Sequence, residues 1–189
     1  YLIENIEFKN NYIKSEGKAG VLSVTGAKNI VRNCVFDGNV SEGICAGLYF
    51  QGDNYSHIVE NCTFKYNQSK SGSAIYCDEG ENDGIKLIIR KCQFLSKRET
   101  KKGGAITSKF ETIVENCTFY DNSSLQEGGA IYSSFLTLNN CEFIKNYSSN
   151  GGAVYYGGTT NINSGLKIIN CTFLKNLAVY NGGAVLYVT

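Results

Sequence analysis

The sequence has no proline, no methionine and no tryptophan, and its only histidine is His57. An inner strand of a parallel sheet donates hydrogen bonds to its neighbours, and proline lacks the amide hydrogen that this requires. The absence of proline therefore fits a sheet-rich fold. Net charge is almost absent too, because 18 Lys and Arg residues stand against 17 Asp and Glu residues, which gives +1. We therefore expect no nucleic-acid partner, because such binding rests on a strongly basic surface.

Long hydrophobic runs and metal-binding motifs are also missing. No apolar run approaches the roughly 20 residues that a membrane-spanning helix needs, so we expect no membrane insertion by this segment. The 8 cysteines include no Cys-x-x-Cys pair, and one histidine is too few for a zinc site of the usual kind. We therefore expect neither a metal nor a cofactor.

What the sequence does contain is a phrase that recurs seven times. Its first half reads Asn-Cys-x-Phe, and its second half, after a few polar residues, reads Gly-Gly-Ala-Ile/Val-Tyr. The first half occupies residues 5–8, 33–36, 61–64, 91–94, 116–119, 140–143 and 170–173, with Ile6 and Lys91 as departures. The second half occupies residues 72–76, 103–106, 128–132, 151–155 and 182–185, and looser copies lie at 19–22 and 46–49.

Successive copies of the phrase lie 24 to 30 residues apart, a spacing typical of solenoids whose units bury their apolar side by stacking. Short alternating stretches such as Leu136-Thr137-Leu138 indicate strands rather than helices. The sequence therefore predicts an all-β fold, a right-handed parallel β-helix of the pectin-lyase-like type with about seven coils. We expect residues 1–189 to form a single repeat domain. Because neither end shows a cap, we expect it to be a segment of a longer solenoid, covalently continuous with further coils, or to have its ends covered by additional chain.

Equivalent residues of successive coils in a parallel β-helix stack about 4.8 Å apart. The repeat predicts an inward column of Phe8, Phe36, Phe64, Phe94, Phe119, Phe143 and Phe173. A second inward column holds Ile6, Cys34, Cys62, Cys92, Cys117, Cys141 and Cys171, and an aliphatic column holds Val21, Leu48, Ile75, Ile106, Ile131, Val154 and Val185. Two asparagine ladders are expected, one of Asn5, Asn33, Asn61, Asn116, Asn140 and Asn170 interrupted by Lys91, the other of Asn11, Asn39, Asn67, Asn122, Asn146 and Asn176 interrupted by Lys97.

The column cysteines are interpreted as small buried thiols. The spacing of their Cα atoms lies in the range that disulfides span, but parallel Cβ vectors disfavour a bond between stacked neighbours. Both states stay open, so the cysteines do not decide the redox compartment.

The pairing of Phe-x-x-Asn with Gly-Gly-Ala-Ile closely resembles the repeat of the chlamydial polymorphic outer-membrane proteins, and the resemblance covers nearly the whole chain. It implies a surface-exposed β-helical domain used in adhesion, and hence an extracellular or cell-surface location. No barrel sequence follows within these residues, so the segment does not support the autotransporter route of that family. The cysteine in almost every coil is more regular than the fold requires. A looser similarity to the cysteine-bearing repeat scaffolds of anaerobic-fungal cellulosomes leaves a docking role open.

The residue after each aliphatic-column position should point outward, because strand side chains alternate. These residues are Leu22, Tyr49, Tyr76, Thr107, Tyr132, Tyr155 and Leu186, and they predict a tyrosine-rich stripe on one wall. Long connections leave the same strands and carry polar residues that could join the site: Asp53, Asn54, Asp78, Glu79 and Asp83. Aromatic rows on rigid sheets suit sugar rings or a protein partner, and exposed loops of solenoids often bind. The competing interpretation is that stacked tyrosines only stabilise the sheet.

Three functions follow in order of preference. The first is an extracellular or cell-surface module that binds a protein or glycan, in the manner of an adhesin and without catalysis. The second is a structural scaffold segment that docks other extracellular proteins. The third is a polysaccharide lyase or hydrolase, which would need carboxylates that converge on one wall. The sequence shows no such convergence, and the fold alone does not choose between these functions.

Overall fold

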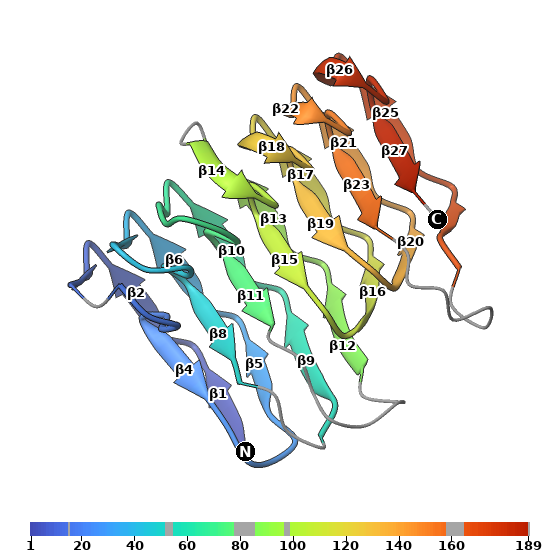
Figure 1. Cartoon of the computed structure of the whole chain (residues 1–189). Helices are drawn as coiled ribbons and strands as arrows, with labels where there is room; N and C mark the ends of the chain where they lie inside the picture. The colour runs from blue at the N-terminus through green and yellow to red at the C-terminus, as the bar shows by residue number, and fades with distance from the viewer. Residues whose placement is uncertain (15, 52–54, 78–85, 97–98, 158–164, 189) are drawn as a thin grey trace.

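The structure is a computed structural model, and it describes residues 1–14, 16–51, 55–77, 86–96, 99–157 and 165–188. These residues form 27 β-strands and no helix. Figure 1 shows the strands stacked side by side in chain order, from the N-terminus at one end of the molecule to the C-terminus at the other.

Three seven-stranded parallel sheets make the walls of the solenoid. Wall A contains β1 (Leu2–Glu4), β5 (Ile30–Arg32), β9 (His57–Glu60), β12 (Lys86–Arg90), β16 (Glu111–Glu115), β20 (Leu136–Asn139) and β24 (Lys167–Ile169). Wall B contains β2 (Glu7–Lys9), β6 (Val35–Asp37), β10 (Thr63–Lys65), β13 (Gln93–Leu95), β17 (Thr118–Tyr120), β21 (Glu142–Ile144) and β25 (Thr172–Leu174). Wall C contains β4 (Leu22–Val24), β8 (Leu48–Phe50), β11 (Ile75–Cys77), β15 (Ile106–Ser108), β19 (Ile131–Ser133), β23 (Val154–Gly157) and β27 (Val185–Val188).

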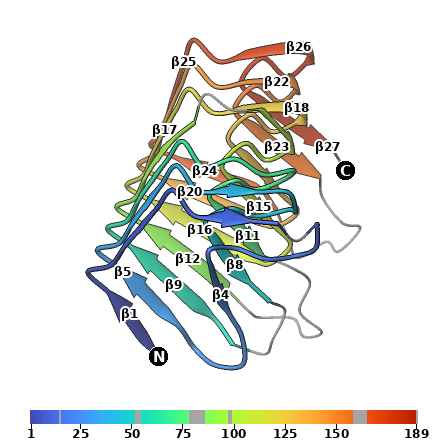
Figure 2. The ribbon, with the colours of Figure 1, turned by 90° about the vertical axis from the view of Figure 1, so that its left-hand side faces the viewer.

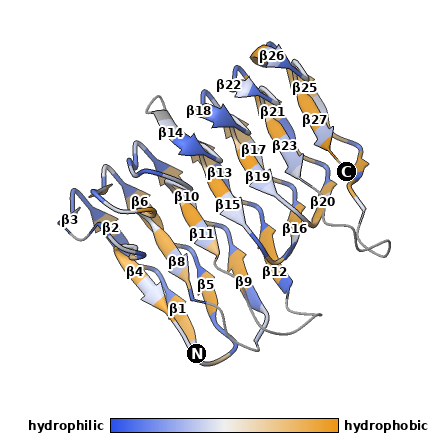
Figure 3. Cartoon of the chain, in the orientation of Figure 1, coloured by the Kyte–Doolittle hydropathy of each residue, from blue (hydrophilic) through white to orange (hydrophobic). Residues whose placement is uncertain are grey.

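A smaller sheet lies between walls B and C. This sheet, called sheet D, contains β14 (Glu99–Lys102), β18 (Ser123–Glu127), β22 (Tyr147–Asn150) and β26 (Leu177–Asn181), and the first two coils have the strand pair β3 (Tyr12–Ile13) and β7 (Val40–Ser41) in its place. Figure 2, a view turned by 90°, shows the walls surrounding a common interior with sheet D at one corner. Figure 3 shows that β14 and β18 are mostly hydrophilic, whereas the wall strands combine hydrophobic with polar or intermediate residues.

The register between strands confirms a parallel β-helix of seven coils. Each strand pairs with its equivalent one coil earlier and one coil later, so that Phe64 of β10 pairs with both Phe36 and Phe94. All seven predicted phenylalanines form one internal stack, with neighbouring ring centroids 4.6 to 5.1 Å apart. The predicted cysteine column is also present, and its five inner members, Cys34 to Cys141, are each 1% exposed. Side chains that repeat once per coil therefore hold the wall strands in position.

Residues in the left-handed region make the bends between walls. The bend from wall A to wall B has φ of 51° to 59° at Asn5, Asn33, Asn61, Lys91, Asn116, Asn140 and Asn170. Asparagine tolerates this region because its short polar side chain can bond locally. Lys91 interrupts the chemistry of this ladder but adopts the same backbone conformation, with φ 55°. The first predicted asparagine ladder therefore lies at a left-handed bend between walls A and B.

The second asparagine ladder carries side-chain hydrogen bonds between successive coils on both sides of its interruption in the fourth coil. Asn146 is 0% exposed, and its Oδ1 accepts bonds from both the backbone N and Nδ2 of Asn122, each at 3.0 Å. Its own Nδ2 donates to Phe119 O at 3.1 Å and to Asn176 Oδ1 at 2.9 Å. The ladder therefore ties three coils together through one buried amide. Lys97, the predicted interruption, lies outside the described residues.

Replacing Asn146 with alanine should lower the free energy of unfolding by about 2–3 kcal/mol, because it leaves buried partners of the amide without their bonds. Chemical denaturation followed by circular dichroism measures the change. Asn139 faces outward on wall A, and its replacement with alanine should change stability by less than about 0.5 kcal/mol. Equal effects of the two substitutions would contradict a structural role for the ladder.

The first coil departs from the predicted alignment by one residue. The sequence repeat placed Val21 in the aliphatic column, but the structure pairs Leu22 with Leu48 and Val24 with Phe50. Because side chains alternate, this register buries Val24 and leaves Ser23 exposed, whereas the predicted register would do the reverse. The prediction that Leu22 points outward was therefore wrong, and Ser23 takes that place.

Candidate interaction surface

The tyrosines predicted to form a binding stripe lie on the outer face of wall C, but not as one stripe. Tyr49 and Tyr76 form one pair with ring centroids 6.2 Å apart, and Tyr132 and Tyr155 form a second pair at 5.4 Å. Between the pairs lies Thr107, which is 4% exposed and donates a hydrogen bond to the carbonyl of Lys102. The predicted stripe included Thr107, but this side chain is buried, so the exposed tyrosines are divided into two pairs at the fourth coil.

The two pairs differ in how much surface they offer. Tyr49 is only 5% exposed, and Tyr76 is half-buried. Tyr132 and Tyr155 are both half-buried and stack nearly parallel, with 10° between the ring planes. The second pair therefore presents the better aromatic platform, and Tyr49 belongs largely to the packing of the molecule.

Charged groups from sheet D lie beside the second pair. Lys102 Nζ is 4.7 Å from the centre of the Tyr132 ring and 2.7 Å from Glu127 Oε2. Burial lowers the pKa of Lys102, but the hydrogen bond to Glu127 and the nearby Tyr132 outweigh it, so the pKa is raised overall. Burial, and then the charge of Glu127, raise the pKa of the Tyr155 hydroxyl. Both groups therefore keep their protons at neutral pH, and the hydroxyl can donate a hydrogen bond.

A polar row continues from these charges along the end of sheet D. Lys102 pairs with Glu127, Glu127 with Asn150, and Asn150 with Asn181, one residue from each successive coil. Asn181 Nδ2 donates to Asn150 Oδ1 at 3.1 Å. We define the candidate surface as Tyr132, Tyr155, Lys102, Glu127 and Asn150. Two stacked rings beside hydrogen-bonding groups can hold a sugar ring or a polar peptide segment.

The sequence prediction missed the members of this row from sheet D. Each of them directly precedes the first glycine of the Gly-Gly phrase, namely Gly103, Gly128, Gly151 or Gly182. This shared position in the sequence marks the row, but only the structure shows that sheet D lies beside wall C. The loop residues predicted to join the site, Asp53, Asn54, Asp78, Glu79 and Asp83, lie outside the described residues.

The cysteines of the column have a structural role. Each of the six donates its thiol hydrogen to the carbonyl two residues earlier, at sulfur-to-oxygen distances of 3.2 to 3.3 Å. These carbonyls lie at the bend, so the thiols supply hydrogen bonds that an aliphatic side chain could not. All eight cysteines are free thiols, and Cys171 of the last coil is the one that is not buried. Burial raises the pKa of Cys34, and it raises that of Cys45 to about 12.

Native protein at pH 8 should therefore react rapidly with a thiol reagent at Cys171 and slowly at the other cysteines, because their burial keeps the reagent away from the sulfur atoms. Mass spectrometry of the alkylated protein, with and without denaturant, measures this difference. Rapid modification of Cys45 in the native protein would contradict the burial of that thiol.

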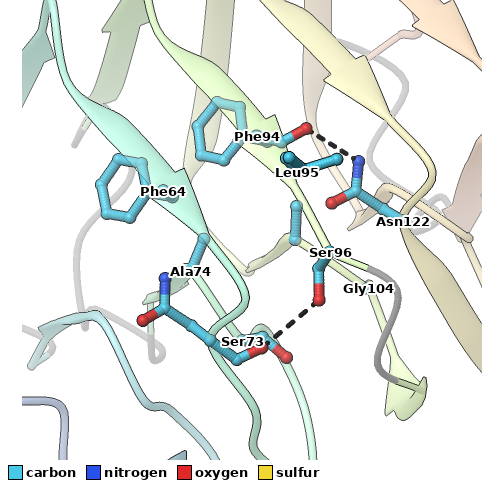
Figure 4. A pocket seen from close by; sticks show the side chains of 10 residues that line it. Phe64, Ser73, Ala74, Phe94, Leu95, Ser96, Gly104 and Asn122 are labelled. Atoms are coloured by element: carbon cyan, nitrogen blue, oxygen red, sulfur yellow. Dashed lines mark hydrogen bonds between the residues drawn. The ribbon is translucent and has the colours of Figure 1, made fainter. Parts of the chain in front are cut away.

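The interior offers little room for a ligand at the point where the asparagine ladder is interrupted. Figure 4 shows a small cavity there, lined by Phe64, Ser73, Phe94, Asn122 and neighbouring residues. Its volume is about 10 Å³, close to the least that holds one water molecule. Ser73 Oγ and Asn122 Oδ1 are buried there without a hydrogen-bond partner in the described part of the chain. This cavity is too small for an organic ligand, so the outer surface is the better candidate.

Seven carboxylates of the described chain lie beside cations. Lysine or arginine nitrogens lie within 4.0 Å of Glu4, Glu7, Glu16, Asp37, Glu60, Glu111 and Glu127. Over the residues that the structure describes, no group of three or more His, Cys, Asp or Glu side chains is placed to hold a metal ion. The same residues include no helix of the length and apolarity that crossing a membrane requires.

The stacked coils, the internal phenylalanine column and the parallel register define a right-handed β-helix. The chain belongs to the family described as the right handed beta helix region, whose model matches residues 2–109. Residues 116–134 match the model of the Chlamydia polymorphic membrane protein repeat, which confirms the resemblance seen in the sequence. Together these matches define a repeat module of the kind found in surface-associated proteins. Searches of curated proteins and of solved structures gave no match.

Proposed function

We propose that this chain is an extracellular or cell-surface module that binds a protein or glycan through the outer face of wall C. The observation that carries the proposal is the stacked pair Tyr132 and Tyr155 with Lys102 and Glu127 beside it. The rings offer a flat apolar face, and the charged and amide groups offer directional hydrogen bonds. The rigid sheet fixes their spacing, which reduces the entropy lost on binding.

We further propose that the module has no catalytic activity. Glycosidic cleavage by the usual route needs two carboxyl groups about 5 to 10 Å apart with room for a sugar between them. At the end of sheet D, Glu127 Oε2 lies 2.7 Å from Lys102 Nζ, and the ion pair holds this carboxylate. This pairing supports binding over hydrolysis at the candidate surface.

The test replaces Tyr132 and Tyr155 together with alanine. Binding to a glycan array and to a panel of immobilised extracellular-matrix proteins should weaken at least about tenfold, because two stacking contacts are lost. Tyr120 provides a matched control, since it also faces outward and also has a lysine over its ring, with Lys145 Nζ 5.4 Å from the ring centre, but it lies on wall B. Its replacement with alanine should leave binding within about twofold.

Two results would contradict the proposal. Binding that survives the double substitution would place the site elsewhere on the molecule. Absence of binding in both panels would favour the scaffold function, in which the tyrosines only support the sheet.

A further inference from the structure

The outer face of wall A carries a regular chemical pattern that the proposed function does not use. Alternate residues of its strands point outward, and one outward row is aliphatic: Leu2, Ile30, Ile58, Ile88 and Ile113, followed by Thr137 and Lys167. The four isoleucines are half-buried, because neighbouring strands cover their sides but not their tips. They form an apolar band across four adjacent coils.

A row of alternating charge runs beside this band. It reads Glu4, Arg32, Glu60, Arg90 and Glu115, one residue from each of the first five coils. Within the chain, Arg32 Nε lies 2.5 Å from Glu4 Oε2 and Arg90 Nε lies 3.1 Å from Glu60 Oε1. The side chains of Arg32 and Arg90 remain 44% and 42% exposed, so they can still meet an external partner. On the other side of the band, Lys86 faces Glu111 at 3.0 Å.

This alternation makes the wall complementary to itself when a second copy faces it with its coils in the opposite order. A two-fold axis that passes between two coils pairs each odd coil with an even coil, so that a glutamate of the row meets an arginine wherever both coils carry a charge. An axis that passes through the coil of β9 would place Glu60 opposite Glu60 of the second copy, and Arg32 opposite its Arg90. Repulsion between these like charges disfavours that arrangement. The pattern therefore selects axes that lie between coils.

One such axis pairs all four isoleucines with one another and the charges of coils two to five with opposite charges. With the axis between β9 and β12, Ile58 lies over Ile88 of the second copy and Ile30 over its Ile113. Glu60 then faces Arg90 of the second copy, and Arg32 faces its Glu115. Lys28, exposed two residues before Ile30, would face Glu111 of the second copy. An axis one coil later would instead place Ile30 against Lys167 and Arg32 against Ile169.

We propose that wall A is a homodimer interface, in which two copies pack face to face with antiparallel coils about an axis between β9 and β12. Six strands about 4.8 Å apart and roughly 17 Å long cover on the order of 500 Å² on each copy. A total near 1,000 Å² lies at the low end of specific interfaces, so the dimer is weak and reversible. It leaves wall C free, and two copies would present two tyrosine surfaces and so gain avidity.

Charge reversal tests the pairing between copies. Arg32→Glu places a glutamate opposite Glu115 of the second copy, and Glu115→Arg places an arginine opposite Arg32. Each single variant should dimerise at least about tenfold more weakly in sedimentation equilibrium. An equimolar mixture of the two variants should recover dimers, because every cross-copy contact then joins opposite charges. Recovery of dimers on mixing cannot come from ion pairs of the charge row within one chain, because each chain still carries only one of the two substitutions.

Lys65→Glu is the matched control, since Lys65 pairs with Asp37 at 3.2 Å in a similar ladder on wall B. It should leave dimerisation unchanged, and circular dichroism of every variant verifies that the coils remain folded. A chain that stays monomeric at high concentration would overturn the proposal. So would a dimer that neither single reversal weakens. Assembly into ever larger species would also overturn it, because that behaviour indicates head-to-tail stacking of terminal coils.

Discussion

Replacing Phe119 with alanine will lower the free energy of unfolding by about 3–5 kcal/mol, the usual loss for a fully buried phenylalanine. Phe119 is 0% exposed and stacks between Phe94 at 4.6 Å and Phe143 at 4.7 Å. The rings above and below are fixed by their own coils, so they cannot close the cavity. Denaturant titration measures the loss.

The position of Phe119 in the middle of the stack adds a second expectation. Each coil of a solenoid contacts only its neighbours, so a weakened central coil can separate the two halves of the molecule. The denaturant dependence of unfolding should then fall, because the halves no longer unfold as one unit.

Two other substitutions serve as controls for this prediction. Tyr120, the next residue, faces outward, and its replacement with alanine should cost less than about 1 kcal/mol. Phe8 lies at the end of the stack, is only partly buried and contacts Phe36 alone in the column, so Phe8→Ala should cost less than Phe119→Ala. A loss below about 1.5 kcal/mol for Phe119→Ala would show that the phenylalanine column does not hold the coils together.

Replacing Gly129 with alanine will lower the free energy of unfolding by about 3 kcal/mol or more, a loss similar to or larger than that of Phe119→Ala. A Cβ atom at this position would lie 2.1 Å from Gly152 O and 2.6 Å from Tyr147 O. Both are backbone atoms of the next coil, so no side-chain rotation can relieve the clash. The coils themselves would have to separate at this corner, which would break hydrogen bonds between them.

Gly183 provides a close control, because it occupies the same place in the Gly-Gly phrase of the last coil. A Cβ atom there would meet nothing within 4 Å. Gly183→Ala should therefore change stability by less than about 0.5 kcal/mol. Thermal unfolding of the two variants side by side measures the contrast, and equal stability would show that the close approach of the coils at Gly129 is not required.

The fold was open to prediction because the chain repeats. Phe119 is recognisable as a core residue only because six other copies of the phrase carry phenylalanine at the same place. The prediction failed in the first coil, where the phrase is loosest. There Val21 and Leu22 both suit the aliphatic column, and the choice depends on whether Ser23 or Val24 enters the core.

The candidate surface was predicted less completely. Alternation along the strands correctly placed Tyr132 and Tyr155 on the outer face of wall C. It could not show that Thr107 is buried, nor that Lys102 reaches over the ring of Tyr132. Those facts depend on the angle at which sheet D meets wall C. The bends between the strands set this angle, and a pattern of alternating residues does not reveal them.

The sequence by itself determined the architecture of this protein: a parallel solenoid of about seven coils with phenylalanine and cysteine in inward columns. It could do so because stacking brings together residues whose separation along the chain is nearly constant. The tertiary structure alone decided which outward residues become neighbours across different sheets, such as Lys102 of sheet D and Tyr132 of wall C. The physical reason is that contacts between sheets depend on the angle of each bend and on side-chain reach, neither of which repeats with the period of the sequence.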